Sequence, residues 1–255
     1  DNHGQGALVS KGAQRIDAAS LDNAQGIVSG ESDVTLSIAG KLDNGQGGLV
    51  SAQRALSFER DDTLLNNAGG RINGGSLLLK GASLDNSDGQ LISQGRLDAI
   101  LGGALVNTGA ARLASGGDLL LRSASVDNRG GKLVSQGLLE ISAGSLDNGA
   151  GGVLNSAKGW LKLVTGLFDN SAGVTQAQSL EIRAGQGVRN QQGHLSALGG
   201  DNRIVTADFD NQGGGLYASG LLSLDGQRFL NQGAAAGQGG KVGAGRIDFS
   251  LAGAL

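Results

Sequence analysis

Proline, cysteine and methionine are absent from this chain, and aromatic residues make up only 3% of it. The lack of cysteine excludes disulfide bonds and thiolate metal sites. Glycine accounts for 48 of the 255 residues, but without proline or a Gly-X-Y period it does not indicate a collagen-like helix. The regular leucines argue against disorder, because disordered chains lack periodic apolar positions.

Charge is also sparse, with a formal net charge of −3 and single acidic and basic residues scattered along the chain. No block of lysine or arginine is present, so we expect no nucleic-acid partner. No apolar stretch approaches the length of a membrane span, so we expect no membrane insertion of this segment. The chain does not begin with methionine and shows no signal peptide. We therefore expect it to be an internal segment of a longer protein.

The chain does contain a sequence repeat of nearly constant length. A Leu-Asp-Asn tripeptide or a looser copy of it returns every 20 to 22 residues, and we place its asparagine at Asn2, Asn23, Asn44, Asn66, Asn86, Asn107, Asn128, Asn148, Asn170, Asn190, Asn211 and Asn231. A fixed period of this length predicts a solenoid, in which each repeat is one coil stacked on its neighbours. We predict one elongated domain over 1–255. It has regular coils in 1–233, an insertion loop at 234–240 and a partial final coil at 241–255.

The pattern within one coil favours short strands. In Val126–Ser145, apolar and polar residues alternate in short runs, which glycine-containing turns separate. A leucine-rich repeat has a similar period but needs a helical return leg, and here the return leg again alternates. We predict an all-β fold with almost no helix. It is a parallel β-helix of about 12 coils with three short strands each, and the crossover rule makes it right-handed.

The asparagine of each coil is expected to point inward, because alternation puts it on the same face as the preceding leucine. A buried amide is costly unless it is hydrogen-bonded. Stacked asparagines meet this need, since each can donate to one neighbour and accept from the other. The predicted structural ladder consists of Asn23, Asn44, Asn66, Asn86, Asn107, Asn128, Asn148, Asn170, Asn190, Asn211 and Asn231.

The aspartates of the tripeptide form an outward row, at Asp22, Asp43, Asp85, Asp127, Asp147, Asp169 and Asp210. Leu65, Val106 and Arg189 interrupt this row, and the nonapeptide calcium motif is absent. We expect a solvated, partly hydrogen-bonded row, with calcium binding as the alternative.

The sequence offers few other candidate residues for a binding or catalytic site. His3 and His194 lie about nine coils apart by the period, so they cannot form a pair. Trp160 and Tyr217 are expected to be packed or half-exposed, and a stacking platform for a sugar is the alternative. The sequence predicts no catalytic residue, no cofactor site and no metal site.

The repeat unit L-D-N-x-x-G-G-x-L-x-S-x-G-x-L-x-L-x-A, best seen in Leu84–Gly103 and Val126–Ser145, resembles a known family. It is similar to the haemagglutinin repeats of filamentous haemagglutinins and of CdiA-type contact-dependent growth inhibition exoproteins. The resemblance covers practically the whole chain. It implies a right-handed β-helix in a large exoprotein that leaves the cell by two-partner secretion and stays at the bacterial surface.

The resemblance also implies a function. This segment would be a monomeric, non-enzymatic stalk that presents adhesive or toxin modules to target cells. Its partners would be an outer-membrane transporter during export and a target-cell receptor or glycan. Two alternatives remain open, namely a receptor-binding segment of the same exoprotein and a carbohydrate-active β-helix enzyme (a polysaccharide lyase or hydrolase). Near-constant coil length argues against the enzyme, because a cleft needs long loops.

Overall fold

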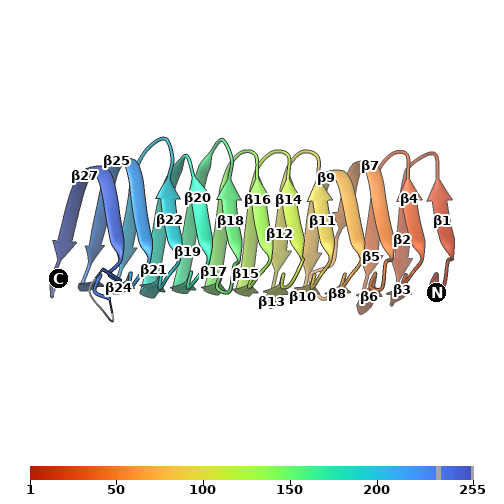
Figure 1. Ribbon diagram of the computed structural model, residues 1–255. Helices are drawn as coiled ribbons and strands as arrows, with labels where there is room; N and C mark the ends of the chain where they lie inside the picture. Colours follow the sequence, from red (N-terminus) through yellow and green to blue (C-terminus); the bar gives the residue numbers. More distant parts are fainter. Residues whose placement is uncertain (234–236, 254–255) are drawn as a thin grey trace. The chain divides into compact units, whose positions relative to one another are not determined.

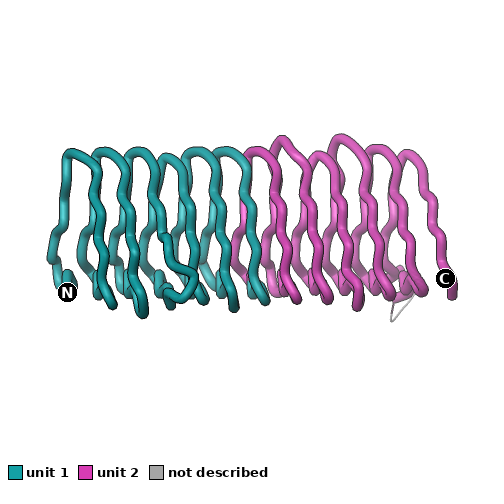
Figure 2. Tube along the Cα trace, turned by 180° about the vertical axis from the view of Figure 1, so that it is seen from behind, with its two compact units in different colours: residues 1–127 teal, residues 128–255 magenta. Residues whose placement is uncertain are grey.

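The computed structural model describes residues 1–233 and 237–253. The predicted insertion at 234–240 therefore lies partly outside the described residues, as does the end of the predicted final coil. Two compact units make up the chain, residues 1–127 (unit 1) and residues 128–255 (unit 2) (Figure 2). That the repeats form one domain stays a prediction.

Unit 1 is built from strands of 2 to 11 residues, many of them connected by glycine-containing turns (Figure 1). These strands are β1 (Ala7–Ser10), β2 (Gln14–Ala18), β3 (Leu21–Asp22), β4 (Ile27–Gly30), β5 (Val34–Ile38), β6 (Lys41–Asp43), β7 (Leu49–Phe58), β8 (Leu64–Asn66), β9 (Arg71–Gly81), β10 (Ser83–Asp85), β11 (Gln90–Ser93), β12 (Leu97–Leu101), β13 (Ala104–Val106), β14 (Arg112–Ser115) and β15 (Leu119–Asp127).

Unit 2 repeats the plan, with strands of 3 to 12 residues. These strands are β16 (Lys132–Ser135), β17 (Leu139–Asp147), β18 (Val153–Ser156), β19 (Trp160–Asp169), β20 (Val174–Ala177), β21 (Ser179–Arg189), β22 (His194–Ala197), β23 (Asn202–Thr206), β24 (Asp208–Asp210), β25 (Gly215–Gly226), β26 (Arg228–Leu230) and β27 (Lys241–Leu251).

Each complete coil contains three strand segments, which we name A, B and C in chain order. In the coil that begins at Asn128, β16 is the A segment, the start of β17 is B and the end of β17 is C. Equivalent segments of successive coils pair in parallel, as where Leu91 of β11 lies beside Leu113 of β14. The predicted class, a parallel β-solenoid of about 12 turns, is confirmed, while its right hand stays a prediction.

The described residues contain no helix, and hence none that could cross a membrane. Strand alternation sets the core instead. In β5, for example, Val34, Leu36 and Ile38 are buried while the residues between them face outward. Buried side chains stack in columns from coil to coil, as Leu139, Leu161 and Leu180 do in unit 2. Burial of each leucine contributes about 1.5–3 kcal/mol.

Candidate functional site: the asparagine corner and the outer faces

An uninterrupted asparagine ladder runs through each unit at the corner that follows the C segment. In unit 1 the side-chain amide of each asparagine donates to the Oδ1 of the next, over 2.7–2.8 Å, through Asn2, Asn23, Asn44, Asn67, Asn86 and Asn107. In unit 2 the same 2.7–2.8 Å bonds connect Asn128, Asn148, Asn170, Asn190, Asn211 and Asn231.

The ladder asparagines also bind backbone. The Nδ2 of Asn170 donates to the Gly173 carbonyl at 3.4 Å and to the His194 carbonyl of the next coil at 3.2 Å. Its Oδ1 accepts a second hydrogen bond from the buried Thr175 hydroxyl, at 2.9 Å. Because these contacts satisfy the amide on all sides, its complete burial carries no unpaired polar group.

One predicted rung is wrong. Asn66 is half-buried and lies outside the ladder, and its neighbour Asn67 is fully buried and bonds to Asn44 and Asn86. The reason lies in the strand register, since Leu65 stacks between Leu42 and Leu84 in the core. Leu65 therefore takes the leucine position of the tripeptide, Asn66 the aspartate position and Asn67 the asparagine position. The prediction that Leu65 interrupts the outward row is therefore also wrong, because Leu65 lies in the core and Asn66 occupies the outward position.

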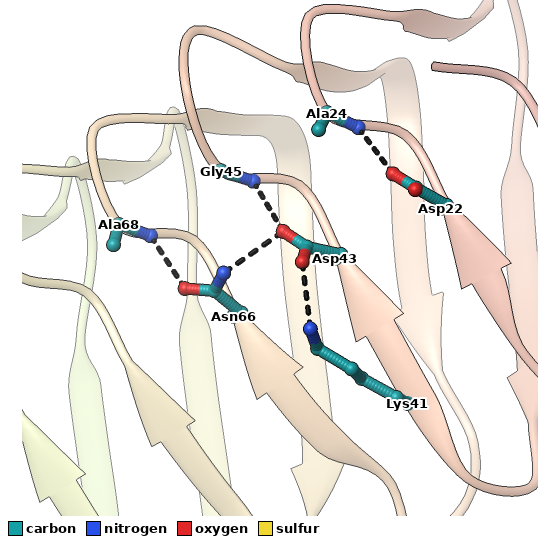
Figure 3. A network of polar contacts seen from close by, with 7 residues as sticks. All are labelled: Asp22, Ala24, Lys41, Asp43, Gly45, Asn66 and Ala68. Carbon is teal, nitrogen blue, oxygen red and sulfur yellow. Dashed lines mark hydrogen bonds and ion pairs between the residues drawn. The ribbon is translucent and has the colours of Figure 1, made fainter.

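The outward row shapes the turns. Asp22 Oδ1 accepts a hydrogen bond from the backbone N–H of Ala24 at 3.0 Å, and Asn66 Oδ1 accepts one from Ala68 at 3.1 Å (Figure 3). The same bond to the residue two positions on, the mark of an Asx turn, also occurs at Asp43, Asp85, Asp147, Asp169 and Asp210. One oxygen of each of these side chains thus fixes the chain direction after the C segment.

Asp43 has the most complete set of partners in this row. Its carboxylate accepts from the Lys41 ammonium at 2.8 Å, the Gly45 N–H at 3.1 Å and the Asn66 amide at 2.8 Å (Figure 3). Partial burial by itself would raise the pKa of Asp43, but these three donors outweigh it and hold the pKa below its usual value. The group is therefore ionised at neutral pH and belongs to the turn.

Within the described part of the chain, no group of three or more His, Cys, Asp or Glu side chains is arranged to hold a metal ion. The two histidines, His3 and His194, are exposed and lie in different units. Tyr217 is half-buried, and its ring lies over Gly215, next to His194. Trp160 is 40% exposed on the B segment of its coil, so an outward platform exists there.

At Asn190 and Asn211 the glycine three residues further on is a steric requirement. A Cβ added at Gly193 or at Gly214 would overlap the backbone carbonyl oxygen of the ladder asparagine one coil earlier. The glycine lets the turn approach that carbonyl closely. At these two corners the N-x-x-G spacing is therefore a consequence of coil stacking.

The coil that begins at Asn231 closes in the same way, although residues 234–236 lie outside the described residues. Gly240 N–H donates to the Asn231 carbonyl at 3.0 Å, and Asn231 Nδ2 donates back to the Gly240 carbonyl at 3.0 Å. A depression of about 450 Å³ lies beside this turn, and its lining residues are Gln191, Gln192, Gln212, Gly213, Gly233 and Gln238.

The family model for the haemagglutinin repeat matches residues 1–46, 27–100, 99–208 and 197–255. These matches together cover the whole chain. The chain belongs to the haemagglutinin-repeat family. No curated protein and no solved structure matches it significantly. The resemblance that the L-D-N-x-x-G-G unit suggested is confirmed.

Family membership and the β-solenoid fold together support a structural segment of a filamentous haemagglutinin-like adhesin. The family also suggests a non-enzymatic protein that is secreted and associated with the cell surface. Sequence reasoning missed the B face of unit 2, by which we mean the outward side chains of the B segments in β17, β19, β21 and β23. Charged and apolar side chains from different coils align on this face. No signal within a single repeat could have revealed it, because the alignment depends on register between coils.

Proposed function

We propose that this segment is a passive, non-enzymatic stalk of a large secreted exoprotein, either a surface adhesin or a contact-dependent growth inhibition effector. The stalk holds adhesive or toxin modules toward a target cell. The observation that carries this proposal is the regularity of the asparagine corner, which repeats the same 2.7–2.8 Å bond at every described step within each unit. Such a stack holds an attached module at a fixed distance and does not bring reactive groups together.

The outward carboxylates support the same conclusion. In Asp22, Asp85 and Asp169, one carboxylate oxygen accepts a hydrogen bond from a turn N–H. Within each unit, such carboxylates are separated by whole coils of about 4.8 Å and do not converge on a common point. This disposition serves the backbone, whereas a polysaccharide lyase or hydrolase needs an acid and a base that face one substrate.

Export and attachment follow from the same proposal. The parent exoprotein crosses the outer membrane through a dedicated transporter and meets a receptor or glycan on the target cell. A receptor-binding role for this segment itself is the second candidate, and the exposed Trp160 favours it, since indole rings stack on sugars. Loss of target-cell binding in Trp160→Ala, with folding intact, would support that candidate.

The stalk proposal is tested by deleting whole coils from the parent protein. Deletion of residues 23–66 joins Asp22 to Asn67 and so restores the Leu-Asp-Asn tripeptide after removing two coils. A stalk tolerates this change, retains delivery or adhesion and shortens by about 10 Å. Deletion of residues 23–55, which ends within a strand, is the matched control and should disrupt folding. Loss of activity after the in-register deletion, with normal export, would overturn the stalk proposal.

A further inference from the structure

The B face of unit 2 carries a column of alternating charge. In four successive coils, the outward residue next to the first buried leucine position is Glu140, Lys162, Glu181 or Arg203, in register. Each is half-buried or exposed. The charges therefore run minus, plus, minus, plus, at the strand spacing of about 4.8 Å.

Exposed apolar side chains flank this column. Trp160 is 40% exposed, Val164 53% and Val205 42%, and all three project from B segments of the same coils. Trp160 lies in register with Ser179, a small and largely buried residue. Leu138 and Glu181 help to line a depression of about 410 Å³ beside Trp160. An exposed aromatic with apolar neighbours is typical of the centre of a protein interface.

Two copies of this column can pair opposite charges if the second copy runs in the reverse direction. Read backwards, the column is Arg203, Glu181, Lys162, Glu140, so two such columns that run in opposite directions place an opposite charge at every position. A twofold axis parallel to the strands, between the coils of Lys162 and Glu181, produces this arrangement. A twofold axis along the stacking direction would instead place each charge against its own copy.

The same axis also sets Trp160 against a small residue. It places Trp160 of one copy opposite Ser179 of the other, so that a large side chain meets a small one. It also places Val164 opposite Arg183, whose guanidinium already pairs with Glu181 at 3.0 Å. An isologous interface requires this kind of self-complementary surface.

We propose that the B face of unit 2 binds the same face of a second copy of this chain, with Lys162 opposite Glu181 and Glu140 opposite Arg203. The sequence alone had favoured a monomer. The face covers four coils of about 4.8 Å and five residues of about 3.3 Å, or roughly 300 Å² in plan per copy. Such an area lies below that of stable complexes and indicates a weak, reversible dimer. Display of many copies on one surface would raise its occupancy.

The first test uses the 255-residue chain in solution. Sedimentation velocity from micromolar to millimolar concentration should show a monomer–dimer equilibrium. Trp160 is the only tryptophan, so its emission should shift to the blue in parallel as dimers form. A monomer over the whole range, with unchanged emission, would overturn the proposal.

The second test uses charge reversal at the central pair. Lys162→Glu and Glu181→Lys should each lower the association constant by at least about tenfold, because like charges then face each other. An equal mixture of the two variants should recover association, since every central pair in the mixed dimer is again opposite. Circular dichroism would confirm that both variants fold.

Lys80→Glu is the matched control, because Lys80 occupies an outward B-segment position in unit 1. It should leave association unchanged. A dimer that resists both reversals, or a mixture that fails to recover, would show that another surface or another register is used and would refute this pairing.

Discussion

The side-chain amide of Asn66 donates a 2.8 Å hydrogen bond to the Asp43 carboxylate of the preceding coil. This bond replaces the repulsion that a consensus aspartate at position 66 would bring to Asp43, since the two residues lie in register on paired strands. The outward row is therefore adjusted locally, by an amide here and by the Lys41 ammonium two residues before Asp43.

The lowered pKa of Asp43 predicts an acid-sensitive contribution to stability. A carboxyl whose folded pKa is depressed stabilises the fold above its unfolded pKa, and this stability is lost as pH falls through the folded value. The loss should therefore begin near pH 4 and continue below it. Lys41→Met should lower the free energy of unfolding at pH 6, and the loss should shrink as pH falls below 4, because protonated Asp43 no longer attracts the ammonium. Urea unfolding of both proteins at several pH values measures this difference, and a pH-independent cost would contradict it.

Asn66 and Asn67 offer a matched pair for the ladder itself. Asn67→Ala leaves the amide of Asn44 and the Oδ1 of Asn86 without their partners in a buried corner, at a cost of about 3 kcal/mol. Asn66→Ala removes only outward bonds and should cost within about 1 kcal/mol. Chemical denaturation compares the two neighbours directly. Equal costs would mean that the ladder does not stabilise the coil.

Alanine substitutions at Gly193 and Gly185 test whether the glycine at the corner is required because a side chain would not fit there. A Cβ at Gly193 would overlap the Asn170 carbonyl oxygen, whereas a Cβ at Gly185 meets nothing within 4 Å. Gly193→Ala should therefore destabilise unit 2 by more than about 3 kcal/mol, and Gly185→Ala by less than about 0.5 kcal/mol. Thermal unfolding followed by circular dichroism distinguishes them, and similar melting temperatures would contradict the close approach seen at the corner.

Much of the fold could be predicted because one coil repeats, so that period and alternation together specify strands, turns and an inward asparagine. The rung at position 66 was misplaced because spacing alone favours Asn66, at intervals of 22 and 20 residues, over Asn67, at 23 and 19. Only the stacking of Leu65 on Leu42 and Leu84 decides between them. Spacing along the chain is a weaker constraint than burial of a leucine.

The outer faces were less predictable for a related reason. Trp160 and Ser179 lie side by side although turns of unequal length precede them. A column across coils depends on where each turn absorbs or omits a residue. Turn length has little effect on stability, so it varies between coils while the core columns stay aligned.

Asn202 is the buried asparagine that the repeat does not explain, and it leads to the last prediction. It lies in a core column between Leu180 and Leu222 and is fully buried. Among the described residues its Oδ1 has no hydrogen-bond partner, and its Nδ2 reaches only the Tyr217 carbonyl, at 3.4 Å. An unsatisfied buried amide costs about 1–3 kcal/mol, and a leucine fits the same place in both neighbouring coils. Asn202→Leu should therefore raise the stability of unit 2 by about 1–3 kcal/mol.

Asn190→Leu, at a ladder asparagine of the same coil, should lower stability, because the bonds to Asn170 and Asn211 are lost. Urea unfolding of the two variants provides the comparison, and destabilisation by Asn202→Leu would show that the Asn202 amide has a stabilising role in the core.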